Sequence, residues 1–285
     1  MLKRLVDKFP SCISQLTLQY RMHEEICLLC NEIVYKGTLK CANENVRSSK
    51  LALKRYPNAV PLPSSNTVTI TDKGWLQRVL DPNRPVVFMD TDKIGGEENG
   101  KEDDRCMNVS LMGDDNKPQS SFKGLEHTRG RNGGGNIVNE TEATIVRGII
   151  RGLLKCGLNV ASIGVICPYR SQLRLIDEDP FLTRMKRAGL EASTIDRYQG
   201  RDKSVIILSM VRSNKKGKSG RLLDDFRRLN VAFSRAKRKL IIVGSFSTLS
   251  SGSAVLRPVL ETIRQKGWIE HLPSNALPMY NSFMN

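Results

Sequence analysis

The sequences TIDRYQGRDKSVIILSMVRSN (194–214) and RRLNVAFSRAKRKLIIVG (227–244) decide the fold of this chain. Each contains an apolar run, Val205–Met210 in the first sequence and Leu240–Val243 in the second. Runs of this length and composition predict strands that are buried on both faces, as in a parallel sheet. The segment Arg227–Ala236, which lies between the two runs, predicts a connecting helix.

Helix and strand signals alternate outward from this stretch. The further expected strands are Val86–Met89, Ile163–Cys167 and Ala192–Ile195. The further expected helices lie around Ile26–Ile33, from Asn139 to Gly157, in part of Tyr169–Arg187 with an interruption near Pro180, and over Val255–Gln265. Prolines interrupt residues 41–84, which we expect to be irregular. The alternation predicts an α/β fold with a parallel sheet covered by helices on both faces.

The chain has 285 residues, enough for one large domain or two modest ones. We expect one domain over 1–285, with a flexible insertion at 93–135 and a loose tail at 273–285. The insertion is rich in Gly, Asn and acidic residues, and such a composition cannot bury enough apolar surface to order itself.

The chain is strongly basic, with 45 Lys and Arg against 29 Asp and Glu and a formal net charge of +16. This charge makes nucleic acid the first partner to expect. A membrane partner is not expected, because the basic residues border apolar strands and do not form an amphipathic helix face. The seven cysteines indicate a reduced, intracellular protein, and no metal site is predicted. The spacing of Cys27 and Cys30 fits core packing better than half a metal site.

Four polar motifs lie next to the expected strands and helices. They are QYRM at 19–22, CPYRSQ at 167–172, TIDRYQG at 194–200 and RRLNVAFSRAK at 227–237. The arginine of QYRM fits either a plain surface residue or a guanidinium that binds a phosphoryl group. Tyr198 fits either the core or a stacking surface, and Asp202 fits either a nucleotide contact or a salt bridge among the arginines. The basic face of the last motif fits either solvent or phosphate.

Gly217-Lys218-Ser219 is similar to the end of a phosphate-binding P-loop. The full motif requires a glycine five positions before Gly217, where Arg212 stands. The sequence also shows no acidic strand end of the kind that holds magnesium. We therefore do not expect a self-sufficient ATPase.

Taken together and in this order, the motifs resemble the second RecA-like motor domain of superfamily-1 helicases, in the group of the nonsense-mediated-decay helicase. YQGRDKS, VRSN, CPYRSQ and the segment Asn31–Cys41 are more narrowly similar to the eukaryotic replication nuclease–helicases. The resemblance covers nearly the whole chain outside 93–135. It implies a RecA-like parallel sheet of the P-loop NTPase type in a second motor domain without its own P-loop.

The resemblance also implies roles for individual residues. Arg21 and Arg235 would be catalytic arginines directed at the γ-phosphate of ATP. Nucleotide contacts would come from Gln19, Gly200, Asp202 and Arg228. The single-stranded DNA track would contain Pro168, Tyr169, Arg170, Gln172, Thr194, Gln199 and Arg212. ATP and Mg²⁺ would be shared with a first RecA-like domain, and an iron–sulfur cluster would belong only to a nuclease domain; neither domain is in this sequence.

The resemblance therefore implies the motor half of an ATP-dependent 5′→3′ DNA helicase of replication and repair. We expect the chain to be a fragment or a truncated gene product, inactive alone, that acts in the nucleus or alternatively the mitochondrion with replication and repair proteins. Two other interpretations stay open. The chain could be a non-catalytic module that binds single-stranded nucleic acid, or a fragment of an RNA helicase of the same superfamily.

Overall fold

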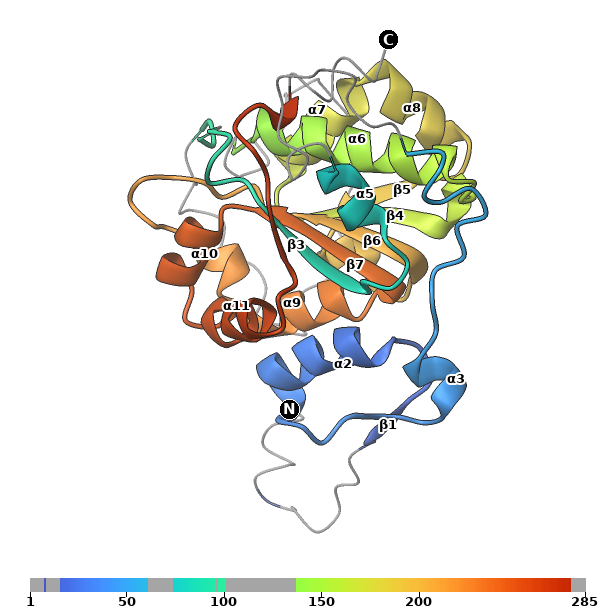
Figure 1. The fold of residues 1–285 in the computed structure, drawn as a ribbon. Helices are drawn as coiled ribbons and strands as arrows, with labels where there is room; N and C mark the ends of the chain where they lie inside the picture. Colours follow the sequence, from blue (N-terminus) through green and yellow to red (C-terminus); the bar gives the residue numbers. More distant parts are fainter. Residues whose placement is uncertain (1–7, 9–15, 61–73, 96, 101–136, 278–285) are drawn as a thin grey trace, which may run out of the picture.

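The computed structural model describes residues 8, 16–60, 74–95, 97–100 and 137–277. Its centre is a parallel sheet with the strand order β5-β4-β6-β7-β3-β8 (Figure 1). The strands are β3 (Val86–Asp90), β4 (Ile163–Cys167), β5 (Glu191–Thr194), β6 (Lys203–Ser209), β7 (Ala236–Gly244) and β8 (Ile269–His271). The two predicted central strands are confirmed as neighbours, with Ile206 opposite Leu240 and Leu208 opposite Ile242.

Helices cover both faces of the sheet (Figure 1). One layer contains α5 (Trp75–Leu80), α6 (Glu140–Lys155), α7 (Arg170–Glu178) and α8 (Pro180–Arg187), and the other contains α2 (Glu24–Cys30), α9 (Phe226–Phe233), α10 (Phe246–Gly252) and α11 (Leu256–Gln265). Successive strand residues point to opposite faces. In β6, Ile206 and Leu208 therefore pack toward the layer of α2 and α9, whereas Val205 and Ile207 pack toward the layer of α6.

Polar residues fix where several helices begin. The Asn139 side chain accepts a hydrogen bond from the backbone N–H of Glu142 at the start of α6, where the sequence predicted a helix to begin. Asp179 caps α8 and precedes Pro180 at the first helical position, where proline is well tolerated because no N–H is needed. The predicted interruption of the helical stretch 169–187 near Pro180 is therefore confirmed. Gly157 ends α6 with φ +87°, a conformation that glycine adopts without strain.

Several short elements were not predicted. Residues 41–84, expected to be irregular, contain α3 (Glu44–Arg47) and α5, whose residues Trp75, Leu76, Val79 and Leu80 are buried. Helix α10 and edge strand β8 were also missed. The remaining elements are a two-stranded sheet of β1 (Leu18–Gln19) and β2 (Lys40–Cys41), a π-helical turn η2 (Asn31–Tyr35), and 3₁₀ turns η4 (Val160–Ser162), η5 (Asp196–Tyr198) and η6 (Arg221–Leu223).

The expected insertion and tail are only partly described. Residues 101–135 of the insertion lie outside the described residues, as do residues 278–285 of the tail. The described start of the insertion makes specific contacts, because Asn99 forms a bridge with Val138 and Glu98 pairs with Arg212. The described start of the tail packs on the core through Ala276, which is 2% exposed.

Candidate functional site

Arg21 and Arg235 lie together at the amino-terminal edge of the sheet, although they are far apart in sequence. Arg21 lies in the turn before α2, and its Nη1 donates a hydrogen bond to the backbone oxygen of Ser234 at 3.3 Å. Arg235 follows Ser234 in the link between α9 and β7. The structure therefore brings together the two arginines to which the family resemblance assigns the same role.

The guanidinium of Arg235 is held in one position by three hydrogen bonds. Its Nε donates to the Val231 oxygen at 3.0 Å, its Nη1 to the Arg201 oxygen at 3.2 Å, and its Nη2 to the Ser234 hydroxyl at 3.0 Å. Burial lowers the pKa of Arg235, and the neighbouring positive charge of Arg21 lowers it further. Two cations placed side by side in a partly buried position would be stabilised by an anion.

Asp202 neutralises part of this cluster. Its carboxylate forms salt bridges with Arg21 at 3.1 Å and with Lys237 at 3.0 Å. Of the two interpretations left open for Asp202, the structure shows the salt bridge among basic residues. The aspartate therefore sets the orientation of Arg21 at this edge.

The other residues predicted to contact the nucleotide differ in how they interact with the rest of the protein. Gln19 organises the turn that carries Arg21, because its side-chain oxygen accepts from the backbone N–H groups of Arg21 at 2.8 Å and Met22 at 2.7 Å. Gly200 has φ +81° and open space where a side chain would be. Arg228 pairs with Asp196 at 3.0 Å.

The residues predicted to contact DNA are divided between the two edges of the sheet. Thr194 ends β5 and Pro168 follows β4, so both lie at the carboxyl-terminal edge. Gln199 lies on the opposite side, because the chain returns to the amino-terminal edge between Thr194 and Lys203, where β6 begins. The return passes through Tyr198, which is fully buried and therefore belongs to the core.

Exposure differs strongly among the residues at the carboxyl-terminal edge. Arg170, the first residue of α7, is exposed. Tyr169 is 4% exposed and packs with Ile137 and Val211. Gln172 is buried, and its amide pairs with the backbone N–H and oxygen of Asn139 at 2.8 and 2.9 Å. Only Arg170 among these side chains is freely presented to a ligand.

Glu142 forms a buried polar contact that the sequence analysis did not identify. Its carboxyl group is fully buried on α6 and accepts from the Ser209 hydroxyl at 2.6 Å and from the Val211 N–H at 2.9 Å. Burial raises its pKa to about 8, and the hydrogen bonds from Ser209 and Val211 only partly oppose this effect. Glu142 is therefore uncharged over much of the physiological pH range, and in this form it holds the end of β6.

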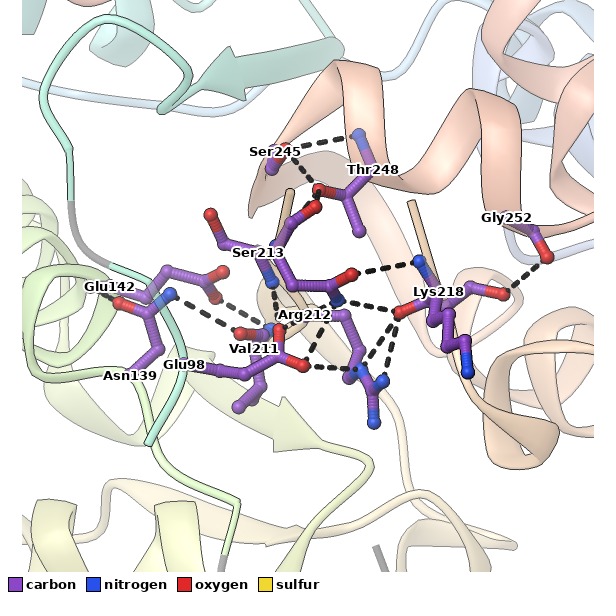
Figure 2. Close-up of polar contacts among 12 residues, drawn as sticks. Glu98, Asn139, Glu142, Val211, Arg212, Ser213, Lys218, Ser245, Thr248 and Gly252 are labelled. Carbon is purple, nitrogen blue, oxygen red and sulfur yellow. Dashed lines mark hydrogen bonds and ion pairs between the residues drawn. The ribbon is translucent and has the colours of Figure 1, made fainter. Parts of the chain in front are cut away.

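Arg212 is also engaged within the protein. Its guanidinium pairs with Glu98 at 3.1 Å and donates to the Lys218 oxygen at 3.1 and 2.9 Å (Figure 2). Both side chains of the ion pair are more than nine-tenths buried. The sequence offered no signal for this pair, because Glu98 lies in the segment whose composition predicted flexibility.

Cys27 and Cys30 are buried in the core, which confirms the interpretation of their spacing as packing. Within the described part of the chain, no helix is both long and apolar enough to cross a membrane.

Comparison with known proteins places these features in a family. Residues 1–247 match a family described as AAA domain. The DNA replication ATP-dependent helicase/nuclease DNA2 of Mus musculus is 39% identical over 87% of this chain and 20% of the mouse protein. The Homo sapiens protein of that name is 34% identical over 96% of this chain and 22% of the human protein. The corresponding protein of Schizosaccharomyces pombe is 34% identical over 97% of this chain and 17% of its own length.

The chain spans about a fifth of the length of these relatives. The family match extends over most of the RecA-like sheet and includes both clustered arginines. The chain therefore belongs to the AAA domain family, and within it to the helicase region of the DNA replication helicase/nucleases.

Proposed function

We propose that this chain is the second motor half of an ATP-dependent 5′→3′ DNA helicase that acts in replication and repair. The observation that carries the proposal is the pairing of Arg21 and Arg235 at the amino-terminal edge, where burial and mutual repulsion favour a bound anion. Arginine forks of this kind stabilise charge on a phosphoryl group during its transfer.

The residues at this edge fit a nucleotide that is bound mainly by another domain. ATP with Mg²⁺ would supply the phosphoryl group whose transfer to water drives movement. Gln19 would hold the turn of Arg21 rigid, Asp202 would orient its guanidinium, and three hydrogen bonds would keep Arg235 in place. Gly200, with open space beside it, leaves room for close approach of a ligand to the backbone.

The carboxyl-terminal edge fits a single strand of DNA. In open α/β sheets, ligands bind outside the carboxyl ends of the strands. Thr194 and the exposed Arg170 lie at the ends of the adjacent strands β5 and β4. We place the nucleotide and the DNA at opposite edges of the sheet, with the first RecA-like domain completing both sites.

Other parts of the proposal come from the relatives. Their printed names give DNA replication, helicase and nuclease activity. We propose a nuclear or alternatively mitochondrial location and replication and repair proteins as partners. An iron–sulfur cluster would belong to a nuclease domain outside this chain.

A region swap tests the catalytic role. This chain replaces the matching region of the mouse helicase/nuclease, and DNA-stimulated ATP hydrolysis is compared with and without Arg235→Ala. We expect Arg235→Ala to lower kcat at least about 100-fold. Arg238→Ala, which removes an exposed arginine from β7, is the matched control and should have little effect. Full hydrolysis by the Arg235→Ala swap would contradict the proposal.

The second candidate is a non-catalytic module that binds single-stranded nucleic acid, favoured by the +16 charge. Two results together would support this second candidate. The chain would bind single-stranded nucleic acid in a salt-dependent way, and ATP hydrolysis by the region swap would not depend on Arg235. Competition between DNA and RNA oligonucleotides would test the related interpretation as part of an RNA helicase.

A further inference from the structure

The loop that follows β6, residues 212–221, is built on a strained turn. Val211 has φ +70°, which is rare and unfavourable for a β-branched residue, and the Arg212 N–H closes the turn on the Met210 oxygen at 2.8 Å. Glu142 and Asn139 hold this turn from α6, because Glu142 accepts from the Val211 N–H and Asn139 donates to the Val211 oxygen at 3.2 Å (Figure 2). The start of the loop is therefore fixed.

The body of the loop is fixed by Arg212 and Asn214. The guanidinium of Arg212 lies between the Glu98 carboxylate and the Lys218 oxygen (Figure 2). The Asn214 side chain accepts from the Lys218 N–H at 2.9 Å and donates to the Lys218 oxygen at 2.8 Å. The Ser219 hydroxyl then ties the loop to α10 by donating to the Gly252 oxygen at 2.7 Å.

This loop forms one wall of an open hollow of about 720 Å³ at the carboxyl-terminal edge of the sheet. Lys216, Lys218 and Arg221 line it, and all three side chains are exposed. Among the residues that the structure describes, no salt bridge joins any of the three to a carboxylate. Asp224 is the one other acidic residue on the described wall besides Glu98, whose charge is matched by Arg212. The described wall of the hollow therefore carries a net positive charge on a backbone held by these hydrogen bonds.

We propose that this hollow binds backbone phosphates of single-stranded DNA through Lys216, Lys218 and Arg221. The inference rests on the proposed function and extends its DNA track. The loop follows β6, which neighbours β4, so the hollow continues the edge that begins at Thr194 and Arg170. Neighbouring strands are about 4.8 Å apart, so β5, β4 and β6 together span roughly 10 Å along this edge.

The proposal also gives Arg212 a different task from the one predicted from sequence. Arg212 positions the loop through Glu98 and the Lys218 oxygen and does not itself contact DNA. The three exposed cations supply the charge, which explains why the loop combines a buried arginine with basic residues that face outward.

The salt dependence of DNA binding tests the proposal. A labelled oligothymidylate is titrated with the unmodified chain and with the triple variant Lys216→Gln, Lys218→Gln, Arg221→Gln at several salt concentrations. Each lost phosphate contact on a single strand reduces the slope of log K against log salt by about 0.7, so three contacts reduce it by about 2. The matched control is Lys155→Gln, Arg187→Gln, Lys266→Gln, which removes three exposed cations outside the hollow.

A slope reduced by about 2 in the triple variant, with little change in the control, supports the proposal. Equal slopes for the two triple variants, with a melting temperature like that of the unmodified chain, overturn it while leaving the proposed function intact. Salt-independent binding by the unmodified chain overturns the DNA track of the proposed function as well. If the triple variant unfolds, each single variant is measured instead, and each should reduce the slope by about 0.7.

Discussion

Replacing Glu142 with glutamine should change how the stability of the protein depends on pH. Glu142 is fully buried, and burial raises its pKa from 4.5 in the unfolded chain to about 8 in the fold. Between these values the folded state keeps a proton that the unfolded state has lost. Its stabilising contribution is therefore complete below pH 4.5 and is lost as the pH rises toward 8.

The magnitude follows from proton linkage. Each pH unit between the two pKa values lowers the free energy of unfolding by about 1.4 kcal/mol, so two units correspond to roughly 3 kcal/mol. Glutamine has nearly the same shape, can accept from Ser209 and Val211, and does not titrate. Relative to Glu142→Gln, the free energy of unfolding of the unmodified protein should therefore fall by roughly 3 kcal/mol between pH 5.5 and 7.5. This corresponds to a fall of roughly 6–12 °C in melting temperature.

Denaturant unfolding at the two pH values measures this difference. Glu140→Gln, which removes an exposed carboxyl group from the same helix, is the matched control. A difference between the unmodified protein and Glu142→Gln that stays constant from pH 5.5 to 7.5 would refute the reasoning. Glu142 would then have the same charge over this range in both states.

Three further predictions concern charged residues of the two edges. In the region swap, Arg235→Lys should lower kcat about as much as Arg235→Ala, because lysine keeps the charge but lacks the two parallel donors of the guanidinium. Arg21→Ala should lower kcat similarly. Normal turnover by Arg235→Lys in steady-state kinetics would argue against a role for the guanidinium geometry. Lys239 is buried and donates to two backbone oxygens, and burial lowers its pKa to about 7. Between pH 7.5 and 9 the free energy of unfolding of the unmodified protein should therefore rise by roughly 2 kcal/mol relative to that of Lys239→Met. A difference between the two proteins that does not change with pH would contradict this. Glu98→Ala should destabilise by about 3–5 kcal/mol because it leaves Arg212 buried without its carboxylate, and a double-mutant cycle with Arg212→Ala that shows no coupling would disprove the pairing.

The sequence was sufficient for the inner strands β3, β4, β6 and β7 because each contains a continuous apolar run. Ile163–Cys167 and Leu240–Val243 need no knowledge of their neighbours to be identified as buried. Helix α5 and strand β8 have six and three residues, and periodicity over so few positions carries little information. Their stability comes from packing on the sheet, as the burial of Trp75 beneath α6 illustrates.

The residue types of the candidate site were predictable from the sequence, but the contacts that each side chain makes were not. The arginines next to strand ends indicated phosphate, and the structure places Arg21 beside Arg235. The burial of Tyr198 could not be read from its motif, because it depends on Gly164, where any side chain would collide with the Tyr198 hydroxyl. The role of Arg212 likewise depends on Glu98, which lies 114 positions earlier in the chain.

The segment from Thr194 to Lys203 gives a physical connection between the two proposed sites. It leaves the carboxyl-terminal edge at Thr194 and reaches the amino-terminal edge at Arg201, whose backbone oxygen binds Arg235. Tyr198 fixes its middle against β4 and cannot shift without displacing the core, because it is fully buried. A change in the position of Arg235 on ATP binding would therefore be passed through a short segment, anchored in the core by Ile195 and Tyr198, to the strand end proposed to face DNA. Tyr198→Phe removes the buried hydroxyl that packs against Gly164 and should loosen this anchor before it affects either edge alone. The expected result is that ATP hydrolysis in the region swap no longer responds to DNA.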